Sequence, residues 1–130
     1  MHPILYQFIV GVGFIMRIIA DEAIIPREKL TKYLLVYQPE NDKSKFLAQA
    51  GYTQDNPDAL EAALREMLTT HDAQFDQHNR FGDVYRVKGA LKGVNECDLL
   101  VISIWMMRTE EDGLYRFVTL KPWRKTNDSA

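Results

Sequence analysis

The spacing of the apolar residues changes near residue 80 from a helical to a strand period, and this change limits the fold more than any other feature. Up to residue 70, apolar side chains recur every three or four residues, as on one face of a helix. Beyond it, Asp83 to Gly89 alternates its side chains with the period of a strand. Helices followed by strands predict an α+β domain, in which about three N-terminal helices pack on a C-terminal antiparallel sheet of three to four strands.

The first two helices are predicted from the residues that begin and end them. Pro26 suits the first helical position, because its missing N–H would have no partner there, and Pro39 ends the helix. Asp42 is a suitable N-cap for the second helix, and Gly51 suits the positive φ that follows a helix end. The first helix is expected to direct four side chains inward: Leu30, Tyr33, Leu34 and Tyr37.

The third helix has the clearest start signal, because Asn56 and Pro57 repeat the pattern of a cap followed by proline. It is predicted to run to about Thr70. The segment from His71 to Asn79 is polar and aperiodic, so it is predicted to be a loop. The residues predicted to face inward from the third helix are Leu60, Ala63, Leu64, Met67 and Leu68.

Two further strands follow Asp83 to Gly89. Leu99 to Met107 is a nearly continuous apolar run, so it is predicted to be a central strand with Trp105 in the core. Leu114 to Lys121 follows an acidic turn that ends at Gly113. The helices are expected to cover one face of the sheet and to leave the other face open to water, a partner or a substrate.

The domain organisation is simple, because 130 residues are ordinary for one domain and short for two. Met1 to Ile15 is apolar, but it is shorter than the roughly 20 residues that cross a bilayer, so no membrane association is expected. Three interpretations stay open: a buried strand or helix, a partner-binding arm, or residues upstream of a natural start at Met16. We predict an appended segment over 1–16, one α+β domain over 17–122 and a polar tail over 123–130.

Charge and cysteine content bear on the binding partners and the cellular compartment of the protein. The net charge of −2 argues against nucleic-acid binding over a broad surface, although a local basic patch stays open. Cys97 is the only cysteine, so it has no partner for an internal disulfide. A reducing compartment, and hence a cytoplasmic location, is expected.

No self-contained catalytic or metal motif is present in the sequence. Gly11 and Gly13 lack the further glycine and the lysine of a phosphate-binding loop. His71 and His78 lie in a polar stretch and are expected at the surface. Neither a metal ion nor another cofactor is therefore expected.

Residues dispersed along the chain can still form a metal-independent ribonuclease site. Such a site needs groups that move a proton and stabilise a phosphorane, and distant segments can supply them. Arg86 and Lys88 share one strand face by their period of two. The residues predicted to form the site are Lys43, Arg86, Ser103, Arg116 and Thr119.

Several sequence blocks occur in a fixed order. They are Ala23 to Leu35, Lys43 to Leu47, Gly51 to Asn56, Tyr85 to Leu91, Val101 to Trp105 and Arg116 to Thr119. Together they resemble a bacterial domain-of-unknown-function family, the one numbered six-eight-eight-three. The family occurs as short free-standing proteins and as the last domain of large adhesin-like toxins, which implies a toxin-like role. The layout of helices followed by an antiparallel sheet resembles the barnase, colicin and RelE group of ribonucleases.

The sequence departs from the family pattern at two places. Many members have a histidine-rich loop before the position of Lys43, whereas Gln38 to Ser44 contains no histidine here, and Asp42 stands at the second histidine position. Ile102 and Ser103 stand where an arginine and a threonine are frequent. If those family residues act chemically, the resemblance implies a weakened or inactive copy.

Two hypotheses follow from the sequence. The first is a toxin-like, RNA-cleaving domain of a toxin–antitoxin or competition system. In it, Lys43 and Arg116 hold phosphate, Ser103 and Thr119 orient by hydrogen bonds, and either Asp42 or Glu40 is the general base. The second is a non-enzymatic interaction module, or a catalytically degenerate family member, that binds a small antitoxin-like or immunity protein.

Overall fold

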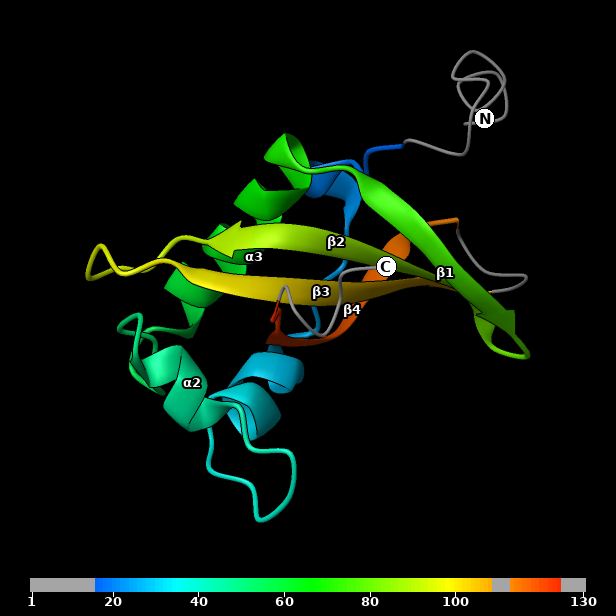
Figure 1. Cartoon of the computed structure of the whole chain (residues 1–130). Coiled ribbons are helices and arrows are strands. Elements are labelled where there is room, and N and C mark those ends of the chain that lie inside the picture. The colour runs from blue at the N-terminus through cyan, green and yellow to red at the C-terminus, as the bar shows by residue number, and fades with distance from the viewer. Residues whose placement is uncertain (1–15, 109–112, 125–130) are drawn as a thin grey trace.

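The computed structural model describes residues 16–108 and 113–124 (Figure 1). The predicted appended segment up to residue 15, the acidic turn at 109–112 and the tail from 125 lie outside the described residues. None of the helices in these ranges is long and apolar enough to cross a membrane. The elements in chain order are η1 (Ala20–Glu22), η2 (Lys29–Leu34), α2 (Ser44–Ala48), α3 (Pro57–Thr70), β1 (Ala73–Asn79), β2 (Gly82–Leu91), β3 (Leu99–Arg108) and β4 (Tyr115–Pro122).

The strands form one antiparallel sheet in the order β1-β2-β3-β4, which confirms the predicted α+β class. The strands predicted within β2, β3 and β4 are confirmed, and β3 pairs with β2 over its whole length, from Leu99 opposite Leu91 to Arg108 opposite Gly82. Helix α3 lies behind the sheet in Figure 1, and η2 and α2 lie beside β4. The helices therefore cover one face of the sheet.

The prediction of a loop over His71 to Asn79 was wrong, because most of this segment is the edge strand β1. It pairs with β2 from Ala73 opposite Val87 to Asn79 opposite Gly82. Only Ala73 is buried in β1, and the other side chains are largely exposed. An edge strand with little buried surface needs no alternation of apolar residues, so it leaves no periodic signal.

Helix α3 runs from Pro57 to Thr70 and buries every residue that was predicted to face inward. The short helix after Asp42 is confirmed as α2, but its N-cap position is Lys43 and not Asp42 as predicted. The Asp42 carboxylate still accepts the backbone N–H of Lys45 at 3.3 Å. Gly51, which follows α2, has the expected positive φ of 86°. The start of α3 and the end of α2 were predictable because proline at the first helical position and glycine at positive φ act locally.

The first predicted helix differs from expectation in length and in type. After a short α-helical start at Arg27, it becomes a π-helix that ends at Leu34, well before Pro39. The N–H of Leu35 donates to the carbonyl of Leu30, five residues earlier, at 3.0 Å. This wider turn changes which residues share a face. Leu30 and Leu34 are buried as predicted, but Tyr33 and Tyr37 are 59% and 62% exposed, so their predicted inward placement was wrong.

The chain before η2 crosses the helix-covered face of the sheet from one edge to the other. Met16 bonds to Ala73 of β1, and Ile24 bonds to both Tyr115 and Phe117 of β4. These contacts satisfy backbone groups that an edge strand would otherwise expose. The Arg65 guanidinium of α3 holds this segment in place by donating to the carbonyls of residues 20 and 23 at 2.6 and 2.8 Å.

The core lies between α3 and the inner face of the sheet. Trp105 and Phe117 are its largest fully buried aromatic side chains, and their rings meet edge to face at 5.3 Å. The predicted core position of Trp105 is thus confirmed. From neighbouring elements, Leu30, Leu47, Leu60, Leu64, Leu91 and Leu120 fill the space around them and are fully buried.

We expect Gly82→Ala to destabilise the fold more than Gly113→Ala. Both glycines have positive φ, but a Cβ at Gly82 would lie 2.2 Å from the Met107 carbonyl oxygen, whereas Gly113 has open space around it. The free energy of unfolding should fall by about 2–4 kcal/mol in G82A and by about 1 kcal/mol in G113A. Urea denaturation measures both, and equal losses would contradict the close contact at Gly82.

Candidate functional site

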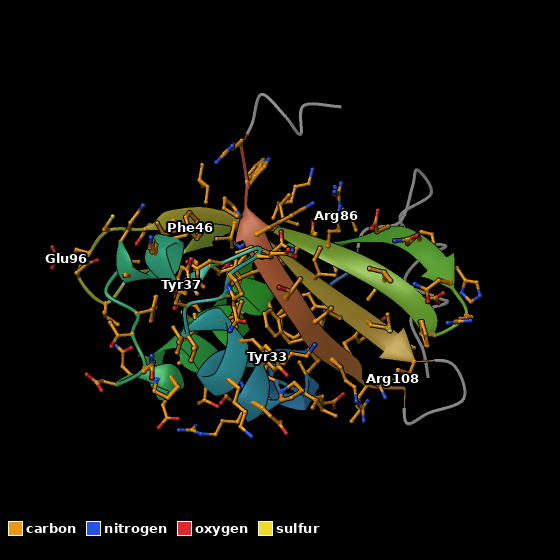
Figure 2. The ribbon with its side chains drawn as sticks, turned by 90° about the horizontal axis from the view of Figure 1, so that it is seen from below. Tyr33, Tyr37, Phe46, Arg86, Glu96 and Arg108 are labelled. Carbon is orange, nitrogen blue, oxygen red and sulfur yellow. The ribbon has the colours of Figure 1, made fainter. Side chains whose placement is uncertain are left out.

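The sheet face opposite the helices carries a group of basic side chains. Alternation along β2 places Arg86 and Lys88 on this face, and the register places Lys121 in the row of Lys88. Figure 2 shows Arg86 on the side of the sheet away from η2, and Arg108 at the end of β3. We call this surface the cationic face, and its basic residues are Arg86, Lys88, Arg108, Arg116 and Lys121.

The cationic face differs in charge from the rest of the chain. At the described strand positions that point outward on β2, β3 and β4, there are basic, hydroxyl and apolar side chains but no carboxylate. The carboxylate of Asp83 belongs to the opposite face, where it pairs with His78 at 2.6 Å. A protein with a net charge of −2 thus concentrates positive charge on one surface.

Apolar side chains lie between the basic ones. Val84 and Ile102 are buried, although they point away from the main core, and Ile104 is half-buried beside them. Long basic side chains that pack their aliphatic stems along a sheet give this combination of buried apolar and solvated charged groups. Lys88 also lies over the ring of Trp123, with 5.8 Å between its Nζ and the ring centroid.

Lys43 joins this surface from the start of α2. Its half-buried amine lies near Lys121, and burial together with the charge of Lys121 lowers the pKa of Lys43, which Asp42 only partly opposes. A lowered pKa increases the fraction of neutral amine at a given pH. The lowered pKa makes Lys43 a candidate proton acceptor in this region.

Arg116 and Thr119 lie on the cationic face as predicted, but in different rows. The register puts Thr119 opposite Ile104, which is itself opposite Arg86, so Thr119 and Arg86 are about 10 Å apart, two interstrand spacings. Arg116 lies opposite Met106, nearer the far end of the strand. The fold therefore brings Lys43, Arg86 and Thr119 to one region and places Arg116 at its margin.

Ser103 does not belong to this surface, which corrects the sequence prediction. It is fully buried on the helix-covered face of β3. Its hydroxyl donates to the carbonyl of Val87 at 3.2 Å and accepts the indole N–H of Trp105 at 2.8 Å. Ser103 therefore satisfies the polar group of a core tryptophan and has no access to a ligand.

The two predicted general bases, Asp42 and Glu40, both lie in the loop before α2. Partial burial disfavours the ionised carboxyl of Asp42, but hydrogen bonds from the backbone N–H of Gln38, the hydroxyl of Ser44 and the backbone N–H of Lys45 outweigh it and lower its pKa. Asp42 thus organises the loop before α2. Glu40 is exposed in the same loop.

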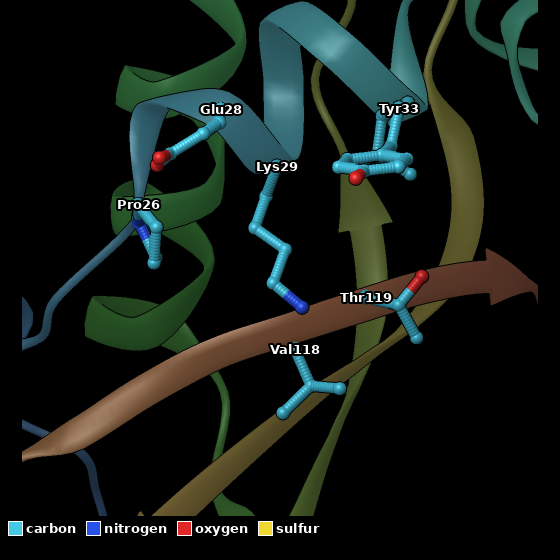
Figure 3. A pocket seen from close by; sticks show the side chains of 7 residues that line it. Pro26, Glu28, Lys29, Tyr33, Val118 and Thr119 are labelled. Atoms are coloured by element: carbon cyan, nitrogen blue, oxygen red, sulfur yellow. The ribbon is translucent and has the colours of Figure 1, made fainter.

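A groove of about 540 Å³ runs between η2 and the outer edge of β4, beside the cationic face. Its walls include the amine of Lys29 and the ring of Tyr33 from η2, and Thr119 from β4 (Figure 3). The sequence prediction did not include Lys29, Tyr33 or Lys121. The period of two from Thr119 to Lys121 could have indicated Lys121, but the π-helix that exposes Tyr33 has no recognisable signal in the sequence.

A metal site is not evident in the described part of the chain, where His, Cys, Asp and Glu do not gather in groups of three or more. The fold and the site together define an α+β domain with a helix-covered sheet and a cationic outer face. The sequence model of the family described as "Domain of unknown function (DUF6883)" matches residues 18–124. The chain therefore belongs to this family. Searches of curated proteins and of solved structures give no match.

We expect Ser103→Ala to lower stability, because it leaves the buried indole N–H of Trp105 without its acceptor. The free energy of unfolding should fall by about 1–3 kcal/mol. The control is Thr119→Ala, which removes a half-exposed hydroxyl and should change stability little. Chemical denaturation of both variants tests this, and wild-type stability of S103A would contradict the assigned role.

Proposed function

We propose that this domain is a toxin-like, metal-independent ribonuclease that binds RNA on its cationic face, and that Lys43 is its general base. The observation that carries the proposal is the position of Lys43, a half-buried lysine of lowered pKa beside Lys121, at the border of the cationic face. The family is described only as a domain of unknown function. The toxin-like part of the proposal therefore rests on the resemblance stated in the sequence analysis.

Phosphate recognition follows from the charge pattern. A polyanion gains affinity wherever several cations lie together, because its condensed counterions are released. Thr119 adds a hydroxyl in the row of Arg86. The overall acidity of the chain does not oppose this interaction, since charges beyond a Debye length of about 10 Å are largely screened.

The chemistry needs a base and groups that stabilise negative charge. In RNA cleavage the 2′-hydroxyl loses its proton and attacks the adjacent phosphorus, which forms a 2′,3′-cyclic phosphate and expels the 5′-oxygen, and this oxygen takes a proton from water. The neutral amine of Lys43 accepts that proton, while Lys121 and Arg86 stabilise the charge of the phosphorane. Lys43 thus replaces Asp42 as the proposed general base, because the carboxylate of Asp42 is hydrogen-bonded within its loop. The buried Ser103 has no role in this mechanism.

We expect Lys43→Ala and Lys43→Arg both to lower RNA cleavage by about 100- to 10,000-fold, the range typical of general acid–base catalysis. The arginine variant is decisive, because a guanidinium keeps the charge but does not release its proton. Lys32→Ala, an exposed lysine on the outer side of η2, is the matched control. The assay uses purified protein and total bacterial RNA with a chelator present.

Either of two results would contradict this proposal. If Lys43→Arg cleaves as well as the wild type, Lys43 provides charge and not a base. If the wild type itself cleaves no RNA, the ribonuclease assignment fails, and a protein partner for the cationic face becomes the next target of study.

The pH dependence offers a separate test. A base must be deprotonated, so kcat/KM should rise with pH and level off below the ordinary lysine pKa of about 10.4. Lys121→Ala removes a positive charge that lowers the pKa of Lys43, so the rising limb should move to higher pH. A limb that stays in place after this substitution would show that another group titrates.

A further inference from the structure

The groove between η2 and β4 has a chemistry that differs from that of the cationic face. It contains one amine from Lys29, hydroxyls from Tyr33 and Thr119, and apolar surface from Pro26 and Val118. In Figure 3 the amine of Lys29 points toward β4 between Val118 and Thr119. A ligand with a flat apolar part and a nearby negative charge matches this combination.

Tyr33 offers the flat surface. Its side chain is 59% exposed, although the helical pattern would bury it, and it lies at the wall of the groove. Exposed aromatic rings beside cations are the usual platform for unpaired bases, since every base has a π-face that stacks. A duplex keeps its bases paired and stacked internally, so it cannot use such a platform.

The charges of the groove give a bound strand a direction. Glu28 lies toward the Pro26 end of the groove, and its carboxylate repels phosphate there (Figure 3). At the other end, β4 continues from Thr119 to Lys121, which lies near Lys43. A polyanion in the groove is therefore favoured to leave over Thr119 toward the two lysines.

The backbone of η2 provides a second, independent observation. Lys29, Tyr33 and Leu34 all belong to the π-helical segment Lys29–Leu34. Such segments are rare and occur frequently at functional sites, because their wider turn costs stability and re-aims side chains. In this chain the wider turn accompanies the exposure of Tyr33 in the groove.

We propose that this groove binds one unpaired nucleotide of single-stranded RNA, with its base stacked on Tyr33 and its phosphate held by Lys29. The strand then continues over Thr119 to the cationic face. This inference rests on the proposed function in one respect, namely that RNA is the ligand of that face. It identifies the substrate class as single-stranded RNA.

The test is fluorescence anisotropy with the full chain and a labelled RNA decamer in which every 2′-hydroxyl is methylated, so that binding is measured without cleavage. The same decamer annealed to its complement is the duplex probe. Tyr33→Leu should weaken single-strand binding roughly 5- to 150-fold, the loss expected for one stacked base, and should leave duplex binding unchanged. Lys29→Met should weaken single-strand binding and reduce its salt dependence.

The matched control is Tyr37→Leu, because Tyr37 is equally exposed but lies outside the groove, with Lys45 over its ring at 5.5 Å. It should bind both probes as the wild type does. Circular dichroism of each variant confirms that it is folded.

The outcomes separate this inference from the proposed ribonuclease activity. Wild-type affinity of Tyr33→Leu, or an equal loss in Tyr37→Leu, would overturn the groove assignment even if unmodified RNA is cleaved. Binding that depends on Tyr33 without cleavage of unmodified RNA would overturn the ribonuclease and leave the groove assignment intact. Absence of binding by the wild type would overturn both.

Discussion

The register of β3 is the constraint on which the rest of the structure depends. This strand is central, with β2 on one side and β4 on the other, and alternate side chains point to opposite faces. Trp105 fixes which set points inward, because its large ring fits only the core and its indole N–H needs the hydroxyl of Ser103. A slip by one residue would move Trp105 to the outer face and turn Ile104 and Met106 inward in its place.

The same register assembles the candidate site. With Trp105 inward, Ile104 and Ile102 point outward, and their partners on β2 and β4 bring Arg86, Lys88 and Lys121 into neighbouring rows. The cationic face is therefore a consequence of core packing on the other side of the sheet. The same arrangement shields the apolar residues of the cationic face, because the long basic side chains lie along them.

The segment before α2 contributes one wall of the groove and the side chain of Lys43, neither of which comes from the sheet. Arg65 and the bridge between Ile24 and β4 hold the chain against α3 and β4, so that η2 begins at the edge of the sheet. From there η2 forms one wall of the groove, and the loop after it delivers Lys43 beside Lys121. The groove and the cationic face share Thr119. One extended ligand can therefore contact both surfaces without a break.

The sequence by itself determined the order of helices and strands, the ends of α2 and α3, and the inner face of the sheet. These features depend on the positions of proline and glycine, on period and on burial of apolar side chains, which neighbouring residues express directly. It also proposed Lys43, Arg86 and Thr119 as site residues, on residue type. The period of two that put Arg86 on the outer face also puts Ser103 on the inner face with Trp105, so the burial of Ser103 could have been predicted.

Only the tertiary structure decided the remaining features. The edge strand β1 forms because β2 offers it hydrogen bonds, and Tyr33 is exposed because η2 is a π-helix. The lowered pKa of Lys43 likewise depends on burial by the folded chain and on Lys121, which is 78 residues away in the sequence. Contacts between distant segments set each of these properties, and short-range sequence patterns carry no record of them.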